Sequence, residues 1–583
     1  MTFRHNGLSG LQTRSKDSLR KLDWVIVLIF CLSLFLRWLI PAQIVPNSPN
    51  DDYLGVMLAN NLLHGHWLGG WTSNTLSKPP AYSFFLMLAH FIPVDPTVIL
   101  HAIYLLIVLA FLRNLRKYFE KELKSWPALN RVFFLLFAFN PAVLANDFSR
   151  IYRISLDSLA SLLFFVLILR LANVLKNIYL TADKTVWKSI KLSQYSKISS
   201  LIGFTYAVMI LTRSEGYWVL ITSIPFVFAI WLSSIISNNR SWKSISKYSS
   251  GIVLIKMISV AVIAFLVPIG IVSEVNKSVY GVSEIENFYT GNYARAINIW
   301  EGVENGKSTL SFIPVSKGQR DAVYKVSPAA LSLKATLDGP PNTGWKTFNC
   351  STTKICDESG AWFPWELRTA AIDNNHISNE IQFQQFFGVL ANELENACKT
   401  HQIKCGAAGA APGARSFLDY PPHQLLDTSM KAFGSLFTLD QAANVGHPDN
   451  GQDPTELKIW HETVNFNYLI VNDDFSNWKG MAHTITTLRT IYQGLLPILF
   501  LLATYSLFIR RKKGAEILNW YALCVLGAMF VFSGGLAIVE SSLGFGAGLS
   551  LYALPMQPLL LLFIAVGVST LFYQYEGTQP DSE

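Results

Sequence analysis

Apolar runs close to the length of a membrane-spanning helix alternate with short polar segments along most of the chain. A helix needs about 20 apolar residues to cross a hydrocarbon core of ~30 Å. The apolar stretch 79–91 opens with two prolines and is too short to span, so we expect it to be re-entrant or interfacial. The pattern predicts a polytopic α-helical membrane protein of about ten transmembrane helices. We place them at residues 23–40, 97–113, 131–146, 156–174, 199–212, 216–236, 251–273, 486–509, 516–536 and 549–572.

Composition and charge support this class of protein. Hydrophobic residues make up 51% of the chain and charged residues 15%, against roughly 25% charged in soluble domains. The segment 23–40 is too long for the apolar core of a cleavable signal peptide and lacks a small-residue cleavage site. The net charge of +8 comes from basic residues in short loops, which set membrane orientation and do not indicate a nucleic-acid partner. Their distribution predicts a cytoplasmic tail at 1–22, an outer loop at 41–96 and a second cytoplasmic tail at 573–583.

A long polar segment, 274–485, interrupts the apolar runs and has the composition of a soluble domain. We expect it to be a mixed α/β domain on the outer face of the membrane. It separates an N-terminal transmembrane module, 23–273, from C-terminal transmembrane helices at 486–572. Within it, the spacing of apolar residues from Ser378 to Cys398 predicts an amphipathic helix.

The outer domain carries four of the six cysteines, namely Cys350, Cys356, Cys398 and Cys405. Cysteines outside the cytoplasm commonly form disulfides. The short separations favour Cys350 with Cys356 and Cys398 with Cys405, although the sequence allows three pairings. Zinc binding is the rival interpretation, but the spacings do not match the usual CxxC ligand pattern.

An acidic pair and a lysine flank a short helical pattern in the first outer loop. Asp51 and Asp52 precede the helical pattern, and Lys78 leads into the next apolar segment. Such carboxylates can cap a helix, and this interpretation stands beside a role in proton transfer. His64 and His66 form an HxH pair without a clear third ligand, so no metal site is predicted.

Four basic residues fall in the short loops on the predicted outer side, against the orientation signal. They are Lys78, Arg150, Arg153 and Arg213. A single one could reach the headgroups or pair with a nearby acid, as Arg213 could with Glu215. Four together favour an anionic ligand. Asp147 and Asp157 flank two of the arginines, and they either orient the arginines or form simple salt bridges with them.

The sequence has no nucleotide-binding fingerprint, because the Gly/Ala-rich run 406–413 is not followed by Gly-Lys-Ser or Gly-Lys-Thr. An enzyme on the outer face cannot draw on cytoplasmic ATP or nucleotide sugars. Any activated donor therefore has to arrive attached to a lipid.

Several short motifs resemble, in their order, those of GT-C glycosyltransferases. The Asp51-Asp52 pair directly follows the first span, and it is followed by Leu58-Ala59-Asn60-Asn61-Leu62-Leu63-x-Gly65-x-Trp67 and Lys78-Pro79-Pro80-x-Tyr82. Leu211-Thr212-Arg213-Ser214-Glu215-Gly216 is similar to the Thr-Arg-x-Glu-Gly turn of many bacterial members, and Tyr552-Ala553-Leu554-Pro555 is similar to their Tyr-x-x-Pro. The likeness covers the first ~240 residues and the last span. The chain resembles in particular the branch of protein O-mannosyltransferases and aminoarabinose-lipid A transferases.

This resemblance implies an inverting transfer of a sugar from a polyprenyl-phosphate carrier to a lipid, glycan or protein acceptor. The location it implies is the outer face of a bacterial plasma membrane, with both chain termini cytoplasmic. Asp51 or Asp52 would act as the general base, with Asp51 the first candidate, and no cofactor is required. The four basic residues would hold the donor phosphate. Supporting roles are expected for Asp147, Asp157, Glu215, Tyr82 and Tyr552.

Two other functions stay open at this point. A ligase or polymerase of lipid-linked glycans would also use outer-face cations, but it would join preassembled oligosaccharides. A transporter or non-catalytic scaffold would use the outer domain to bind a partner. Trp67, Trp71 and Tyr82 could stack on a sugar or serve as interfacial anchors. The sequence does not name the sugar or the acceptor.

Overall fold

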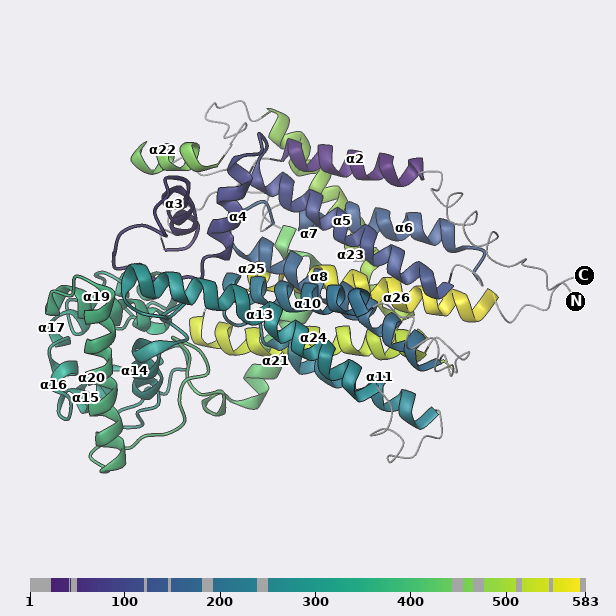
Figure 1. The fold of residues 1–583 in the computed structure, drawn as a ribbon. Coiled ribbons are helices and arrows are strands. Elements are labelled where there is room, and N and C mark those ends of the chain that lie inside the picture. The colour runs from purple at the N-terminus through teal and green to yellow at the C-terminus, as the bar shows by residue number, and fades with distance from the viewer. Residues whose placement is uncertain are drawn as a thin grey trace, which may run out of the picture.

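The computed structural model describes residues 23–40, 42, 50–119, 123–144, 148–180, 192–237, 250–442, 454–464, 476–509, 516–544 and 549–576. Long helices lie side by side in a bundle, and the shorter helices α14 to α20 gather at one end of it (Figure 1). The start of α2 and the end of α26 lie at the opposite end.

The bundle is formed by helices from both halves of the chain. They are α2 (Trp24–Leu39), α3 (Asp52–Leu63), α4 (Ala81–His90), α5 (Pro96–Phe119), α6 (Trp126–Ala138), α7 (Pro141–Leu144), α8 (Ile154–Leu180), α10 (Leu192–Thr212), α11 (Trp218–Ser237), α13 (Ser250–Tyr280), α21 (Pro422–Thr438), α22 (Pro454–Thr463), α23 (Ser476–Ser506), α24 (Glu516–Leu543), α25 (Leu549–Ala553) and α26 (Met556–Glu576).

The chain is a helical membrane protein, but the prediction of ten spanning helices is wrong. In the part of the chain that the structure describes, six helices are long and apolar enough to cross a membrane: Pro96–Phe119, Ile154–Leu175, Ile255–Tyr280, Met481–Ser506, Glu516–Leu543 and Met556–Tyr573. In the other four predicted spans the apolar helical stretches found among the described residues are shorter, at Trp24–Leu39, Trp126–Ala138, Ser196–Thr212 and Trp218–Ile230. One reason is visible at 131–146, where α6 ends before Asn140 and the Asn140 Oδ1 accepts the backbone N–H of Ala142 in α7, 3.0 Å away.

The segment 79–91 contains α4, which has 10 residues. At 1.5 Å per residue, a helix of that length covers about 15 Å, half of the hydrocarbon core. This length agrees with the expectation that the segment is too short to span the membrane.

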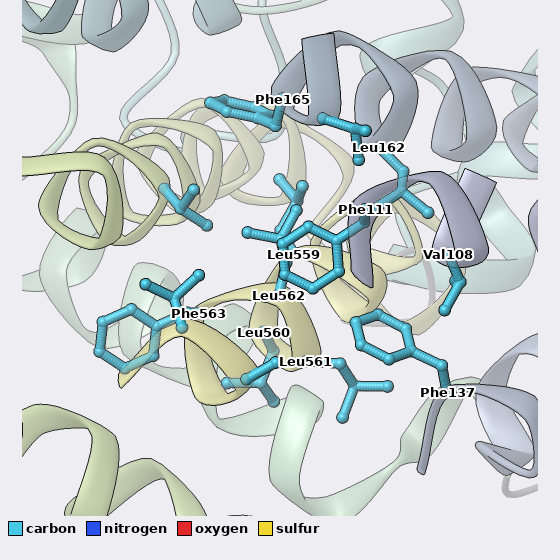
Figure 2. Packing of buried hydrophobic residues seen from close by; sticks show 14 of the residues in the cluster. Val108, Phe111, Phe137, Leu162, Phe165, Leu559, Leu560, Leu561, Leu562 and Phe563 are labelled. Atoms are coloured by element: carbon cyan, nitrogen blue, oxygen red, sulfur yellow. The ribbon is translucent and has the colours of Figure 1, made fainter. Parts of the chain in front are cut away.

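Apolar side chains from several helices fill the centre of the bundle. Figure 2 shows Val108 and Phe111 of α5 and Phe137 of α6 beside the run Leu559 to Phe563 of α26. Because α26 is apolar on all sides and surrounded by other helices, it forms the core of the bundle. Gly203 permits the close approach of α10 to α13, since a Cβ there would lie 1.9 Å from the backbone oxygen of Ala261.

The domain predicted for the outer face, for which we keep the name outer domain, is helical, so the expectation of a mixed α/β domain is wrong. Its helices are α14 (Gly291–Glu301), α15 (Lys317–Tyr324), α16 (Pro328–Leu331), α17 (Lys334–Leu337), α18 (Lys346–Thr353), α19 (Phe363–Asn375) and α20 (Glu380–Lys399). Between residues 281 and 442 the structure contains isolated bridges, such as Val303 with Cys405, but no strand. Local caps satisfy the backbone instead, as at Ser316, whose side chain accepts the N–H of Gln319 in a capping box.

Two sequence predictions for this domain are confirmed. The amphipathic helix is α20, which buries Phe383, Phe387 and Leu390 in the domain core. The cysteines form two disulfides, which join Cys350 to Cys356 and Cys398 to Cys405.

Candidate functional site

Four segments that are distant in sequence meet where the outer domain touches the bundle. They are the start of α3 with the loop that follows it, the turn before α8, the turn between α10 and α11, and the segment between α13 and α14. We call their charged residues the polar junction: Asp51, Asp52, Lys78, Arg150, Arg153, Arg213, Glu215 and Glu286. Asp147 lies outside the described residues.

Asp51 stands immediately before α3 and pairs with Lys78. The Lys78 Nζ lies 2.8 Å from the Asp51 Oδ1, and the Asp51 side chain is 34% exposed. Asp51 has the N-cap position, but its side chain makes no capping hydrogen bond, so a capping role does not explain it. Partial burial raises the pKa of Asp51, but the charges of Lys78 and Arg153 outweigh that effect and lower it to about 2.

Asp52 is held differently from its neighbour. It is fully buried and accepts hydrogen bonds from both Nε and Nη2 of Arg150, each at 2.8 Å. This bidentate pair links the start of α3 to the turn before α8. Tyr82 of α4 is also buried, and it interacts electrostatically with Asp52 and Arg150.

Arg153 and Arg213 are close enough to interact electrostatically, and the charge of Arg153 also acts on Asp51. The Arg153 Nη1 donates to the carbonyl oxygen of Thr212 at 3.4 Å, and the Arg213 guanidinium lies 5.0 Å from the centre of the Tyr552 ring. Among the described residues, the Arg153 Nε and the Arg213 Nη1 are buried without a hydrogen-bond partner. Buried donors of this kind are costly unless something accepts from them, so the pair suits an anion with several oxygens.

Other predicted residues surround these arginines. Glu215 accepts from the Arg213 Nε at 3.3 Å, and the charge of Arg213 offsets the effect of burial to lower the pKa of Glu215 to about 2. Asp157 is buried on the first turn of α8 and interacts electrostatically with Arg213 and Arg153. The structure therefore places Asp157, Glu215 and Tyr552 around Arg213.

The segment between α13 and α14 completes the site with residues that the sequence analysis missed. Glu286 accepts a hydrogen bond from the Ser214 hydroxyl, and the Tyr289 hydroxyl donates to Glu215 Oε1 at 2.8 Å. Burial raises the pKa of Glu286 to about 7, although the charge of Arg153 acts in the opposite direction. Neither Glu286 nor Tyr289 belongs to a sequence motif. The only signal in the sequence was that an acid and a tyrosine lie close to the end of the seventh apolar run.

The outer domain also fixes the loop that carries Lys78. The buried Arg368 of α19 donates to the carbonyl oxygens of Ser73 and Thr75. The backbone N–H of Asn287 donates to the carbonyl oxygen of Leu76 at 2.7 Å. The Trp71 indole N–H donates to Glu380 at 3.0 Å. Trp71 thus connects the loop to the outer domain, instead of serving only as an interfacial anchor.

Two cavities adjoin Lys78. One has a volume of about 280 Å³ and is bounded by α3, the loop 68–78 and Tyr280. The other, of about 120 Å³, is lined by Phe288, Tyr289, Trp365 and Pro412 of the outer domain, among others. Lys78 therefore stands between the two cavities, with its Nζ 5.6 Å from the centre of the Trp365 ring.

No group of three or more His, Cys, Asp and Glu side chains that could hold a metal ion occurs in the part of the chain that the structure describes. Comparisons with protein-family models, with curated proteins and with solved structures found no match to this chain.

Proposed function

We propose that the chain is a membrane glycosyltransferase that moves a sugar from a polyprenyl phosphate to an acceptor hydroxyl. The observation that carries the proposal is the polar junction, where Asp51 lies beside Lys78 and next to Arg153. A carboxylate beside several cations is what such a reaction requires, since one proton has to be removed and one phosphate has to leave. We propose a bacterial plasma membrane as the location, with the outer domain on the outer face.

In this mechanism the acceptor oxygen attacks the anomeric carbon of the donor sugar. The bond between that carbon and the phosphate oxygen breaks, and its electron pair leaves with the polyprenyl phosphate. Arg153 and Arg213 offer buried N–H groups to the phosphate oxygens. Asp51 takes the acceptor proton. A single displacement of this kind inverts the anomeric carbon.

The ion pair of Asp51 with Lys78 adds one step. With a pKa of about 2, Asp51 is a weak base, and a general base works best when its pKa is near the working pH. The donor phosphate competes with Asp51 for the Lys78 ammonium group. Once Lys78 binds the phosphate, the pKa of Asp51 rises toward its ordinary value and the base becomes stronger. Donor binding therefore activates the base.

The structure favours Asp51 over Asp52 as the base. Both oxygens of Asp52 accept from Arg150, and the side chain is buried. This arrangement supports a structural role for the pair, so we assign the donor phosphate to Lys78, Arg153 and Arg213.

The test is transfer of radiolabel from a panel of polyprenyl-phosphate sugars, using the purified protein in nanodiscs with a native lipid and protein extract as acceptor. The wild-type protein should label a product, and Asp51→Asn should reduce the rate by about 10²- to 10⁴-fold. Asp321→Asn is the matched control, because Asp321 lies on the surface of the outer domain and pairs with Lys317 one helical turn away. Equal rates for wild type and Asp51→Asn would refute the assignment. A ladder or a transferred block would instead indicate the glycan polymerase or ligase.

A further inference from the structure

The cavity of about 280 Å³ beside Lys78 has the features of a binding site for a small polar ligand. Its wall combines polar side chains with apolar ones. The polar residues are Asn61, Thr72, Asn74, Thr75 and Lys78, and the apolar ones include Leu54, Met57, Leu58, Leu68 and Leu76. Trp71 and Tyr280 add two aromatic rings.

The size of this cavity limits the ligand. Small-molecule pockets have volumes of roughly 300–1,000 Å³, so about 280 Å³ is just below that range. It accommodates one ring with its substituents, which is about a dozen non-hydrogen atoms for a hexose. An isolated serine or threonine side chain would leave most of the space unfilled.

The chemistry of the wall matches that of a sugar. Hydroxyl groups of a sugar both donate and accept hydrogen bonds, as do the amides of Asn61 and Asn74. The C–H faces of a sugar ring pack on apolar surface such as Leu58 and Leu76. The cavity therefore has both kinds of partner that a sugar ring needs.

The wall is held rigidly, which distinguishes this cavity from a gap in a loose loop. The Tyr280 hydroxyl donates to the carbonyl oxygens of Trp67 at 3.0 Å and Gly69 at 2.9 Å. Arg368 holds the far end of the same loop through Ser73 and Thr75. A wall fixed before the ligand arrives lowers the entropy cost of binding.

The cavity also has the right position for an acceptor. Lys78, the ion-pair partner of Asp51, forms part of its wall, whereas Arg153 and Arg213 pack against Tyr152 and Tyr552. A ligand in the cavity is therefore next to Lys78, which pairs with the proposed base Asp51 and which the donor phosphate would also bind.

We propose that this cavity binds a sugar residue of the acceptor, so that the acceptor is a saccharide and the transferred sugar joins one of its hydroxyl groups. This inference rests on the proposed glycosyltransferase function for the reaction, but binding of a sugar in the cavity can be measured without any transfer.

Gly70 gives a direct way to fill the cavity. It lines the cavity, and a Cβ at this position would meet no atom within 4 Å. Gly70→Phe therefore places a large side chain at the wall of the cavity without a clash at the Cβ. Gly434→Phe is the matched control, because Gly434 lies in α21 and its Cβ would also meet no atom within 4 Å.

The probes are methyl glycosides of mannose, glucose, galactose and N-acetylglucosamine, and their binding to the full-length protein in nanodiscs is measured by saturation-transfer NMR. We expect at least one glycoside to bind, and Gly70→Phe to raise its Kd at least about tenfold while Gly434→Phe leaves it unchanged. Binding of polyprenyl phosphate should be the same in all three proteins, which shows that Gly70→Phe is folded.

The outcomes separate this inference from the proposed function. If no glycoside binds, or if Gly70→Phe binds as tightly as wild type, the saccharide assignment is wrong. If no glycoside binds but label passes from the donor to a serine- or threonine-containing peptide, the proposed glycosyltransferase function is supported and only the saccharide acceptor is ruled out. If glycosides bind in the cavity but no donor reacts, the sugar site stands and the transfer proposal falls.

Discussion

Glu286 is a buried carboxyl group at the contact between the outer domain and the bundle, so replacing it with Gln tests the electrostatics of the polar junction. Its side chain is 4% exposed and accepts a hydrogen bond from Ser214. Arg153 favours the ionised form, whereas burial and the charge of Glu215 favour the neutral form. The net effect raises the pKa of Glu286 from 4.5 to about 7, so the neutral form predominates below about pH 7.

The size and sign of the effect follow from linkage between proton binding and folding. Between pH 4.5 and about 7 the folded protein keeps the Glu286 proton that the unfolded chain has lost. The contribution of this group to the free energy of unfolding is therefore fully present below pH 4.5 and is lost as the pH rises to about 7. At roughly 1.4 kcal/mol per pH unit, the loss amounts to about 3 kcal/mol. A glutamine cannot ionise, and it can still accept from Ser214.

We expect Glu286→Gln to stabilise the protein above pH 7 by up to about 3 kcal/mol relative to wild type, and to have almost no effect at pH 4.5. The measurement is thermal or denaturant unfolding of the nanodisc-embedded protein at pH 4.5, 6 and 8.5. Glu284→Gln is the matched control, since Glu284 lies on the same segment and is only partly buried. A difference between Glu286→Gln and wild type that does not change with pH would refute the reasoning.

Two further predictions concern neighbouring parts of the site. Asp52→Asn should cost about 3–5 kcal/mol of stability, because it removes the charge of a fully buried carboxylate that pairs with the largely buried Arg150. Asp51→Asn should cost at most about 1 kcal/mol, because its pair is partly exposed, so unfolding and transfer assays should separate the two. Arg368→Met removes two hydrogen bonds from a charged donor, each worth about 1.5–3 kcal/mol, and should speed hydrogen exchange across the loop 68–78. Arg295→Met, on the domain surface, should not.

These two predictions have clear contrary outcomes. Equal stability of Asp51→Asn and Asp52→Asn would mean that the Asp52–Arg150 pair does not anchor α3. Unchanged exchange of the loop in Arg368→Met would mean that the outer domain does not hold the wall of the sugar cavity.

Sequence patterns correctly predicted the features that depend on residues close together in the sequence. The amphipathic spacing that marks α20 depends on residues within one helix, and the two disulfides join cysteines only six and seven positions apart. The charged residues of the polar junction other than Glu286 were also singled out, because an acidic pair follows the first apolar run and four cations in short outer loops contradict the orientation rule. The class of protein followed from the length of the apolar runs.

Sequence patterns failed where distant segments decide the structure. Glu286 and Tyr289 bind partners 72 and 74 positions away, and Arg368 binds a carbonyl oxygen 295 positions away. No local pattern encodes such contacts. The expected strands of the outer domain were wrong for a related reason: helices as short as the four residues of α16 have too few turns to show helical periodicity.

The two adjacent aspartates, Asp51 and Asp52, have different partners because they lie on either side of the start of α3. Asp52 is the first residue of α3, whereas Asp51 precedes the helix and has non-helical backbone angles, so Asp52 pairs with Arg150 while Asp51 pairs with Lys78. The buried pair of Asp52 with Arg150 fixes the start of α3 against the turn before α8. That turn also carries Arg153, whose charge acts on Asp51. The anchor therefore sets the position of the proposed base relative to one of the cations that would hold the leaving phosphate, although it contributes no atom to the reaction.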